Sequence, residues 1–393
     1  MIYLITAAPL KTHQQIKLPV LKGVKRVFRF LRIYGFRRTL YKVLARGRFD
    51  IGPLRPSAAS RRNIGMLGCG QFGFATIGCI LVGSRGNEFI DCFDPNDRAQ
   101  QTFARFFRIA NPSQSGSDLL SNPAVQLVYV ASNHASHASY AISALNAGKS
   151  VYIEKPIVVT WNQASQLFEV VRRHPGRAFA GYNRPFSAAI RQVRQAAQDM
   201  QGPISLSCTV IGHVLEPDHW YRNPDEGTRI CGNVGHWIDL AVHALRWSSN
   251  PRTFTIAICY SDLSSSDDNI SISLSTPRGD LVSIVLSSRG EPFEGINETI
   301  VFQQASLISK INDFREMHLW EGDRLRRFSF RPKDVGHIHA ILQPFSSPSR
   351  DWTEVEISTI IMLFITDMVR NGDMVGRLDI DACYRRIGIQ AEL

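Results

Sequence analysis

Residues 63–81 read NIGMLGCGQFGFATIGCIL, and this stretch decides the fold. The apolar residues 63–67 predict a short strand, and a helical pattern follows the glycines. Between them, Gly68, Gly70 and Gly73 have the GxGxxG spacing of a dinucleotide-binding turn. Glycines here permit a tight turn, close approach of a pyrophosphate and close packing of helix on strand. We therefore expect the turn to bind a cofactor through Gly68, Gly70, Gln71, Phe72 and Gly73.

The next predicted strand, residues 88–93, ends in Asp94, about 20 residues past the last glycine. A carboxylate at this distance is expected to accept hydrogen bonds from the hydroxyls of the adenine ribose. Because it also repels a ribose phosphate, Asp94 favours NAD over NADP. The alternative role for Asp94 is to cap a helix that begins near Asp97.

Strands and helices alternate in this part of the chain. Residues 125–131 and 150–153 are predicted strands, and residues 137–147 form a predicted helix between them. This alternation favours a parallel, doubly wound sheet, whose ligands gather at the carboxyl ends of the strands. The polar residues at those ends, which we expect to contact the cofactor, are Ser132, Asn133, Glu154 and Lys155, with His134 beside them as a loop residue.

The pattern changes after residue 203. Five strands separated by turns are predicted at residues 205–211, 253–260, 269–275, 281–287 and 298–303. The sequence thus predicts an α/β protein: a Rossmann doubly wound parallel sheet over residues 63–180, then an α+β domain with a largely antiparallel open sheet over residues 181–393. A late helix is expected at residues 354–369, with the tail packing back on the body.

The net charge of +11 comes from the first 62 residues, which hold fifteen Lys and Arg but one acid. The other 331 residues carry 30 basic and 33 acidic side chains. Residues 21–46 have helical amphipathic spacing interrupted near Gly35, and residues 50–62 resemble a linker. Such a basic helix can lie on an anionic membrane surface or pack on its own protein or a second subunit. No recognition motif supports nucleic-acid binding.

The seven cysteines are scattered, with no CxxC pair, which fits buried thiols in a reducing compartment. No apolar run reaches the roughly 18 residues of a membrane span, and the apolar start lacks the preceding basic region of a signal peptide. We expect a cytoplasmic protein, with peripheral contact at the inner membrane surface as a further option.

Four segments resemble the Gfo/Idh/MocA oxidoreductases, a family named for glucose-fructose oxidoreductase and inositol dehydrogenase. They are ASNHASHA at 131–138, AGKSVYIEKP at 147–156, GYNRPFS at 181–187 and HWYRNPDEGTRICGNVGHWIDL at 219–240. The resemblance covers about residues 62–393. It implies an NAD(P)-dependent oxidoreductase and a homo-oligomer. The GTRIxGN-type motif is similar to that of enzymes of polysaccharide and nucleotide-sugar biosynthesis, which implies a sugar or nucleotide-sugar substrate.

The resemblance also implies roles for single residues. Lys155 would stabilise the reacting oxygen, and His236 would act as general base or acid; the alternatives are a partner for Glu154 and a core histidine. Asn133 and His137 would line the nicotinamide side. The expected substrate-binding residues are Tyr182, Asn183, Arg184, Asn233 and Trp220, although Arg184 fits a domain-interface salt bridge nearly as well.

Two features of the second motif region bear on the chemistry. His236, Asp239 and His243 have metal-ligand spacing on a helix, but no further cluster accompanies them, so we expect no metal. Many family members carry an Asp where this chain has Gly232, which leaves proton transfer to Lys155 and His236. A catalytically silent dinucleotide-binding scaffold in a glycan-assembly complex is therefore the alternative function, and the retained Lys155 and His236 favour the enzyme.

Overall fold

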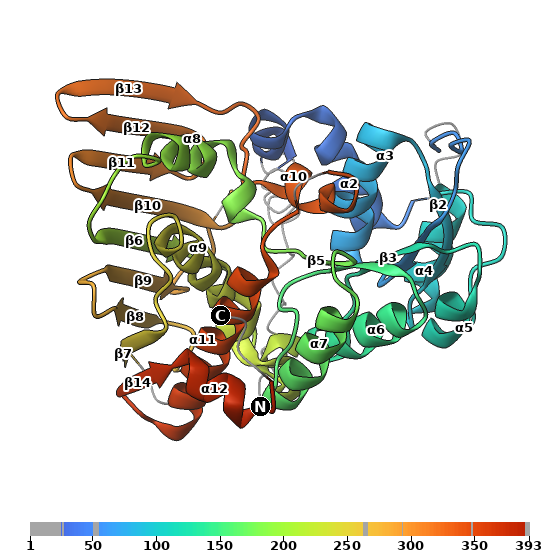
Figure 1. Ribbon diagram of the computed structural model, residues 1–393. Helices are drawn as coiled ribbons and strands as arrows, with labels where there is room; N and C mark the ends of the chain where they lie inside the picture. Colours follow the sequence, from blue (N-terminus) through green and yellow to red (C-terminus); the bar gives the residue numbers. More distant parts are fainter. Residues whose placement is uncertain are drawn as a thin grey trace, which may run out of the picture.

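The computed structural model describes residues 25, 27–49, 55–261, 266–292, 294–346 and 349–389. These residues form two sheets with helices packed between them (Figure 1). A five-stranded parallel sheet lies on the right of Figure 1, and a nine-stranded sheet lies on the left. The predicted fold class is confirmed.

The first sheet has the strand order β2-β1-β3-β4-β5, with every pair parallel. Its strands are β1 (Ile64–Leu67), β2 (Phe89–Phe93), β3 (Leu127–Val130), β4 (Ser150–Ile153) and β5 (Ala178–Ala180). The intervening helices are α3 (Cys79–Arg85), α4 (Asp97–Phe106), α5 (Gly116–Ser121), α6 (His134–Asn146) and α7 (Trp161–Arg173). The order reverses between β1 and β3, and ligands bind parallel sheets at the carboxyl ends beside such a reversal.

The second sheet has the order β13-β12-β11-β10-β6-β9-β8-β7-β14, and only β6 and β9 pair in parallel. Its strands are β6 (Ile204–Ile211), β7 (Thr253–Tyr260), β8 (Ile270–Ser275), β9 (Leu281–Ser287), β10 (Asn297–Gln304), β11 (Leu307–Asn312), β12 (Glu316–Glu321), β13 (Arg324–Ser329) and β14 (Val375–Asp379). All five predicted strands are present; β11 to β14 were not predicted.

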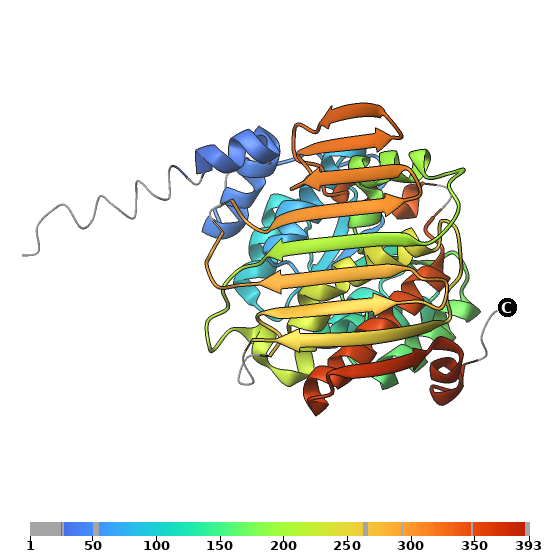
Figure 2. The same cartoon turned by 90° about the vertical axis from the view of Figure 1, so that its left-hand side faces the viewer.

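Each face of the second sheet has a different environment. Alternate residues of β6 are buried and exposed along its whole length, as in a sheet with one solvated face. Helices α8 (Ala188–Ala196), α9 (Gly235–Leu245) and α11 (Trp352–Asn371) cover one face, and Figure 2 looks onto the other, uncovered face. After α11, helix α12 (Ile380–Arg386) packs back on the body, as expected for the tail.

The basic leader bends where the sequence predicts. Residues 27–34 are helical, Gly35 has a positive φ of 80°, and helix α2 (Phe36–Gly47) follows. Tyr41 and Leu44 are buried in the core that also contains β1. Helix α2 is therefore part of the first domain. Of the predicted settings for the leader, packing on its own protein is the one that this helix shows. Residues 50–54 of the predicted linker (50–62) and residues 21–24, at the start of the predicted helix (21–46), lie outside the described residues.

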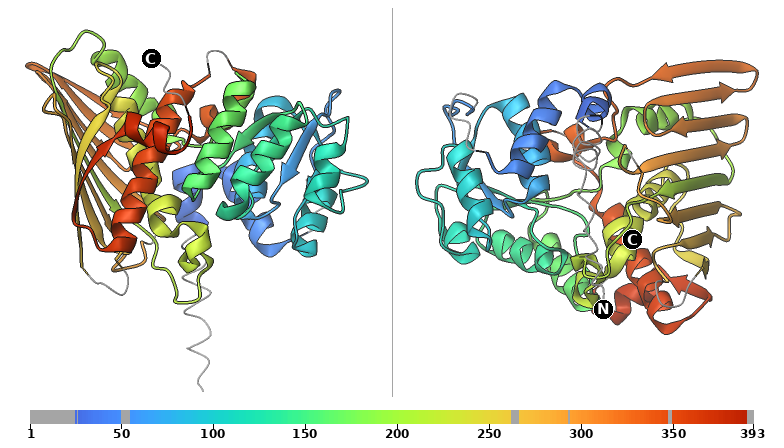
Figure 3. Two further views of the ribbon diagram at one scale, coloured as in Figure 1. Left: turned by 60° about the horizontal axis from the view of Figure 1, so that its bottom comes forward. Right: turned by 180° about the vertical axis from the view of Figure 1, so that it is seen from behind.

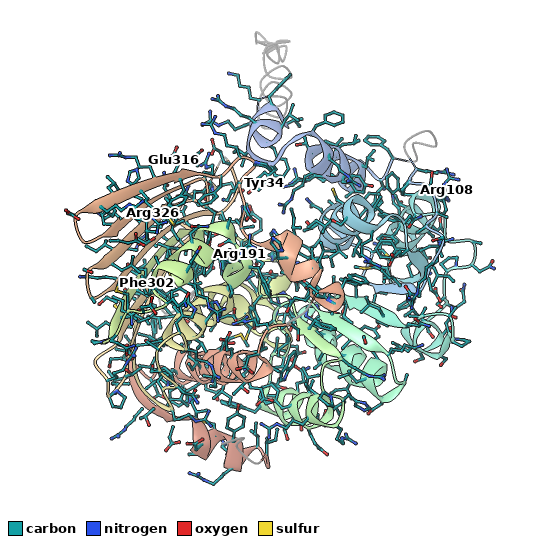
Figure 4. The ribbon with its side chains drawn as sticks, turned by 45° about the horizontal axis from the view of Figure 1, so that its top comes forward. Tyr34, Arg108, Arg191, Phe302, Glu316 and Arg326 are labelled. Carbon is teal, nitrogen blue, oxygen red and sulfur yellow. The ribbon has the colours of Figure 1, made fainter. Side chains whose placement is uncertain are left out.

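The leader also contacts the second domain. The backbone N–H of Lys333 donates to the carbonyl of Ile33, 2.8 Å away, and Arg29 pairs with Glu294. Seen from behind, the leader lies at the junction of the two halves (Figure 3). Tyr34, labelled in Figure 4, belongs to this segment, and its ring lies under the guanidinium of Arg38. Within the described part of the chain, no helix is both long enough and apolar enough to cross a membrane.

A late segment of the chain returns to the parallel sheet. Helix α10 (His337–Ile341) ends in Ile341, which is buried in the same core as β1 and β3. The carbonyl of Ile341 accepts from the hydroxyl of Tyr129, 2.7 Å away, and the amide of Gln343 donates to the carbonyl of Ala180 at 2.9 Å. Residues 337–343 thus complete the first core although they lie about 160 positions beyond β5.

Candidate active site

The glycine turn has the backbone that its sequence predicts. Gly68 has φ 93°, and a Cβ there would lie 2.3 Å from the carbonyl oxygen of Ala131. A Cβ on Gly73 would lie 2.4 Å from the Gly68 carbonyl, whereas one on Gly70 would meet nothing within 4 Å. The turn is therefore closed on the strand side and open at Gly70, as a backbone that receives a pyrophosphate requires.

Asp94 lies against this turn. Its carboxylate accepts from the backbone N–H of Cys69 at 2.7 Å and from that of Asn96 at 2.8 Å. The cap of helix α4 is Asn96, whose side chain accepts from the N–H of Ala99. The carboxylate of Asp94 thus lies against the glycine turn. The alternative role, capping of helix α4, belongs to Asn96.

Lys155 comes from the carboxyl end of β4. Its Nζ donates to the carbonyl oxygen of Gly232 at 2.9 Å, which joins the first sheet to the π-helical turn η6 (Ile230–Val234). The preceding Glu154 is buried, and burial raises its pKa to about 7. No side-chain hydrogen bond between Glu154 and Lys155 is present, so Lys155 is not simply held by its neighbour.

Two polar atoms without partners lie close to Lys155. His236 is the second residue of α9, which directly follows η6, and its Nδ1 is buried without a hydrogen bond. The Oδ1 of Asn233, inside η6, is buried and unpaired as well. Buried polar atoms are nearly always satisfied, so two unpaired atoms three residues apart make this segment a candidate for binding a polar ligand. Burial, and then the charges of Arg184 and Lys155, hold the pKa of His236 well below its ordinary value, which keeps the ring neutral.

The absence of a side chain at position 232 has a steric cause. A Cβ on Gly232 would lie 2.7 Å from Cε2 of Tyr221 and 2.8 Å from Cε1 of His134. The ring of Trp220 packs edge-on against His134, with centroids 4.6 Å apart, and is 45% exposed. Trp220 thus stands at the rim of the site, as expected of a substrate contact, and the aromatic rings fill the space beside Gly232.

The start of α6 is held by a residue that the sequence did not point to. The carboxylate of Glu226 accepts from the side-chain amide of Asn133 at 2.7 Å and from the N–H of Ala135 at 3.0 Å. A carboxylate at a helix N-terminus complements the helix dipole. Asn133 is exposed but already engaged by this carboxylate from the second domain. The one available signal was the acidic residue directly before the GTRIxGN segment.

Ser132 and His137 join neighbouring strand ends. The Nδ1 of His137 lies 2.8 Å from the carbonyl of Pro156, and its Nε2 lies 3.1 Å from the carbonyl of Ser132. Burial lowers the pKa of His137 to about 4, so the ring is neutral and donates from one nitrogen only. His137 is buried between the two loops rather than facing a nicotinamide, which corrects its expected direct contact.

The expectation that Tyr182, Asn183 and Arg184 face the substrate is wrong for this structure. Arg184 is buried and forms a bidentate pair with Glu298, at 2.9 and 3.0 Å, which is the salt-bridge alternative. Asn183 donates to the carbonyl of Val335 at 2.5 Å and accepts from Arg184. Tyr182 is buried in the apolar core. The chain crosses between the two sheets at these residues, so their side chains are buried in the protein and their polar groups bond to other protein groups.

The residues with metal-ligand spacing are also engaged. Asp239 accepts two hydrogen bonds of 2.7 Å from Arg350, and the Nδ1 of His243 lies 2.9 Å from Glu354. Among the residues that the structure describes, no three His, Cys, Asp or Glu side chains are grouped for a metal ion.

Comparisons with known proteins agree with this geometry. Residues 62–182 match the model of the Gfo/Idh/MocA group, described as an oxidoreductase family with an NAD-binding Rossmann fold. Over these residues the chain is similar to the Gfo/Idh/MocA oxidoreductase family. The predicted family resemblance is thus confirmed, and a family that binds NAD agrees with the predicted cofactor.

Curated members of the Gfo/Idh/MocA family share about half of the chain. Oxidoreductase P35 of Formosa agariphila is 32% identical over 178 residues, which are 45% of this chain and 53% of that protein. Inositol 2-dehydrogenase of Ralstonia nicotianae is 28% identical over 206 residues, which are 50% and 57% of the two chains. The chain therefore matches only about half the length of these relatives.

Solved structures match over a longer range at lower identity. Levoglucosan dehydrogenase in complex with NADH and levoglucosan has a TM-score of 0.66 at 16% identity, covering 82% of this chain and 100% of that one. GenD2 from gentamicin A biosynthesis, in complex with NAD, has a TM-score of 0.65 at 17% identity, covering 84% and 99%. At identities this low, the structural match establishes the shared two-sheet fold.

Proposed function

We propose that the protein is an NAD-dependent oxidoreductase that transfers hydride between the nicotinamide and a secondary hydroxyl or keto group of a sugar or nucleotide-sugar. The observation that carries this proposal is the turn in which Lys155 reaches Gly232 beside the unpaired polar atoms of Asn233 and His236. Lys155 lies at the carboxyl end of β4, where substrates meet dinucleotides in such folds, and Asn233 and His236 approach it from η6 and α9.

The glycine turn and Asp94 are the residues that would hold the cofactor. The open backbone at Gly70 suits the pyrophosphate, and the Asp94 carboxylate, already at the turn, suits the ribose hydroxyls. The chemistry that a bound nicotinamide supplies is acceptance or donation of hydride. Asp94 favours NAD over NADP in this proposal because its charge opposes a ribose phosphate.

Lys155 is the proposed electrostatic catalyst. Its Nζ is held by a single carbonyl oxygen at 2.9 Å, which leaves donors for a substrate oxygen. In oxidation the hydroxyl oxygen gains negative charge as its proton departs to the base, and in reduction the carbonyl oxygen gains it as hydride adds to the carbon. An ammonium beside that oxygen stabilises the charge in the transition state. The proposed role of Lys155 follows from this position.

His236 is the proposed general base in oxidation and general acid in reduction. A base must be unprotonated before the reaction, and the lowered pKa keeps the imidazole neutral at physiological pH. The unpaired Nδ1 and the adjacent Oδ1 of Asn233 are suited to a substrate hydroxyl, and Trp220 provides an apolar rim for a sugar ring. The names of inositol and levoglucosan dehydrogenases support a polyhydroxylated substrate.

Nicotinamide absorbance at 340 nm tests the proposal. The intact protein is mixed with NAD and a panel of free sugars and nucleotide-sugars, alongside Lys155→Met. Production of NADH with one substrate, lost in the variant, is the expected result. Binding of NADH without turnover on any substrate would favour the alternative, a silent dinucleotide-binding scaffold in glycan assembly.

We propose that residues 63–180 and 181–393 are the two functional domains. We also propose that the uncovered face of the nine-stranded sheet is the contact surface of a homo-oligomer. The seven cysteines are unpaired, which suits a cytoplasmic protein, here of polysaccharide biosynthesis.

Contact with an anionic membrane stays a proposal for the leader. Phe28 and Phe36 are 68% and 72% exposed among basic residues, although the opposite side of α2 is buried. Retention of the intact protein on anionic but not on neutral vesicles, and its loss in Phe28→Ser/Phe36→Ser, would support this contact.

A further inference from the structure

A cavity of about 780 Å³ lies between the leader and the second domain. The leader forms one wall, and the loops after β6 and β9 form the other through His213, Glu291 and Glu294. Gln71, from the glycine turn, lines the cavity too, whereas Lys155 and His236 do not. The cavity is thus distinct from the proposed catalytic turn but adjoins the proposed cofactor site, and its volume suits a nucleotide-sized ligand.

The leader wall combines cations with aromatic rings. Lys42 and Arg46 line the cavity from α2, and Phe30 and Phe49 line it from either side of that helix. The Nζ of Lys42 lies 3.9 Å from the ring centroid of Phe30, and Phe49 is 54% exposed. Aromatic faces stack on nucleobases, and Lys and Arg bind phosphates. This pairing of side-chain types is suited to a nucleotide.

Acidic residues line the opposite wall, and each has a basic partner. Glu294 pairs with Arg29 and, at 2.9 Å, with Arg315, and Glu291 lies 2.9 Å from Nδ1 of His213. Lys42 and Arg46 line the cavity from the other side, on the leader.

The cavity is fixed in relation to the glycine turn. Arg48, the residue after α2, has a positive φ of 53°, and its guanidinium donates to the carbonyl oxygen of Cys69 at 3.1 Å. Non-glycine residues rarely adopt this conformation unless the surrounding contacts hold it. The end of the leader is therefore anchored on the turn that would hold a pyrophosphate.

We propose that this cavity binds a nucleoside diphosphate group, with the base against Phe49 and the phosphates at Lys42 and Arg46. The proposal rests on the proposed oxidoreductase function and deepens it, because the group then belongs to a nucleotide-linked sugar. The ADP half of the dinucleotide is placed outside this cavity, with its pyrophosphate at Gly70 and its ribose at Asp94.

Calorimetric titration of the full chain with UDP and with ADP, each with and without saturating NADH, tests this proposal. We expect saturable binding of at least one nucleotide that weakens about tenfold in Arg46→Gln and in Phe49→Ala. Arg32→Gln is the matched control, since Arg32 is an exposed cation of the leader that does not line the cavity. It should bind as the parent does.

The NADH arm separates this cavity from the cofactor site. Nucleotide binding that persists with NADH present assigns the cavity to a nucleotide-linked substrate. Binding that NADH abolishes places the nucleotide in the cofactor site and overturns the proposal. Absence of nucleotide binding, or equal affinities in all variants, overturns the proposal.

The outcome is separable from that of the proposed function. NADH binding, followed by nicotinamide fluorescence, and turnover are measured on the same preparations. A protein that binds UDP but reduces no NAD retains the cavity proposal and loses the oxidoreductase one. Turnover on a free sugar without any nucleotide binding gives the reverse result.

Discussion

The Nζ of Lys155 donates to the carbonyl oxygen of Gly232 at 2.9 Å, and this contact joins the end of β4 to the turn that presents His236. Replacing Lys155 by Met removes the ammonium but retains much of the stem. We expect turnover to fall by about 10² to 10⁴, the usual range for a positioned proton-transfer or charge-stabilising group. NADH affinity should change little, because the glycine turn is untouched.

Steady-state rates and NADH fluorescence titrations check this prediction. Lys310→Met serves as the control, since Lys310 lies on the exposed side of β11 in the second sheet. Unchanged turnover in Lys155→Met would remove Lys155 from the mechanism even though the fold assignment stands.

Asp94 is predicted to set the preference between the two nicotinamide cofactors. Asp94→Ser removes a negative charge next to the ribose site, and a charge-charge repulsion over about 5 Å is on the order of 1–3 kcal/mol near a protein surface. The ratio of the NADPH to the NADH dissociation constant should therefore fall by about tenfold or more. Asp97→Asn, in the first turn of α4, is the charge-matched control, and equal ratios in both variants would contradict the prediction.

Position 232 is predicted to tolerate no side chain. In Gly232→Ala the new methyl group overlaps Tyr221 and His134, so we expect destabilisation by about 1–3 kcal/mol. Gly232→Asp should lose stability and activity rather than gain a proton-transfer group. Urea unfolding measures the cost, and Tyr221→Ala combined with Gly232→Ala should recover part of it. A fully stable, more active Gly232→Asp would show that the rings move aside freely.

Acid should destabilise the protein from about pH 6.5 downward. Burial lowers the pKa of seven histidines, and five of them are the most deeply buried: His134, His137, His236, His243 and His337. Their folded pKa values lie below the unfolded value of about 6.5, so below that pH the unfolded chain binds more protons. Each one contributes a loss of about 1.4 kcal/mol per pH unit until its folded pKa, about 4 for His137, is reached.

Glu154 acts in the opposite sense. Burial raises its pKa to about 7, so between about pH 4.5 and 7 the folded state holds the extra proton and gains stability as the pH falls. One such group offsets one of the five histidines, and the net effect remains a loss in acid. Free energies of unfolding at pH 7.5, 6.5 and 5.5 should show this slope, and His337→Gln should flatten it. A stability that does not change over this range would contradict the burial of these rings.

The leader helix is predicted to be needed for stability. Leu44→Ala opens a cavity in the core around β1 and should cost about 2–5 kcal/mol, whereas the exposed neighbour Val43→Ala should cost less than about 0.5 kcal/mol. Deletion of residues 1–50 should then destabilise the first domain, not merely release a tail. Thermal unfolding of the two variants is the measurement, and equal melting temperatures would contradict the packing.

Local patterns were enough to predict the two sheets and the glycine turn. A strand, a GxGxxG turn and an acidic residue 20 positions later have fixed spacing, so Gly68 and Asp94 lie where the sequence predicts. Strands β11 to β13 were missed. Ser309 stands on the buried side of β11, and three of the six residues of β13 are arginines, so neither strand has a clean apolar alternation. Hairpin pairing joins these strands to the sheet.

Contacts between distant segments could not be predicted. A buried arginine and a substrate-binding arginine look alike in sequence, and Arg184 is distinguished only by Glu298, 114 positions away. The capping of α6 by Glu226 is a contact of the same kind. The amphipathic spacing of the leader also does not determine what its apolar face packs against, because a membrane surface and a protein core select the same periodicity.

The return of α10 to the first sheet bears on how this chain can be recombined. A chimera joined at residue 180 would keep all five parallel strands, yet it would lose Ile341 from their core and the carbonyl that the hydroxyl of Tyr129 requires. Buried hydroxyls without acceptors are costly. An exchange of residues 181–393 would therefore have to keep residues 337–343, or a peptide of the same shape, for the parallel-sheet domain.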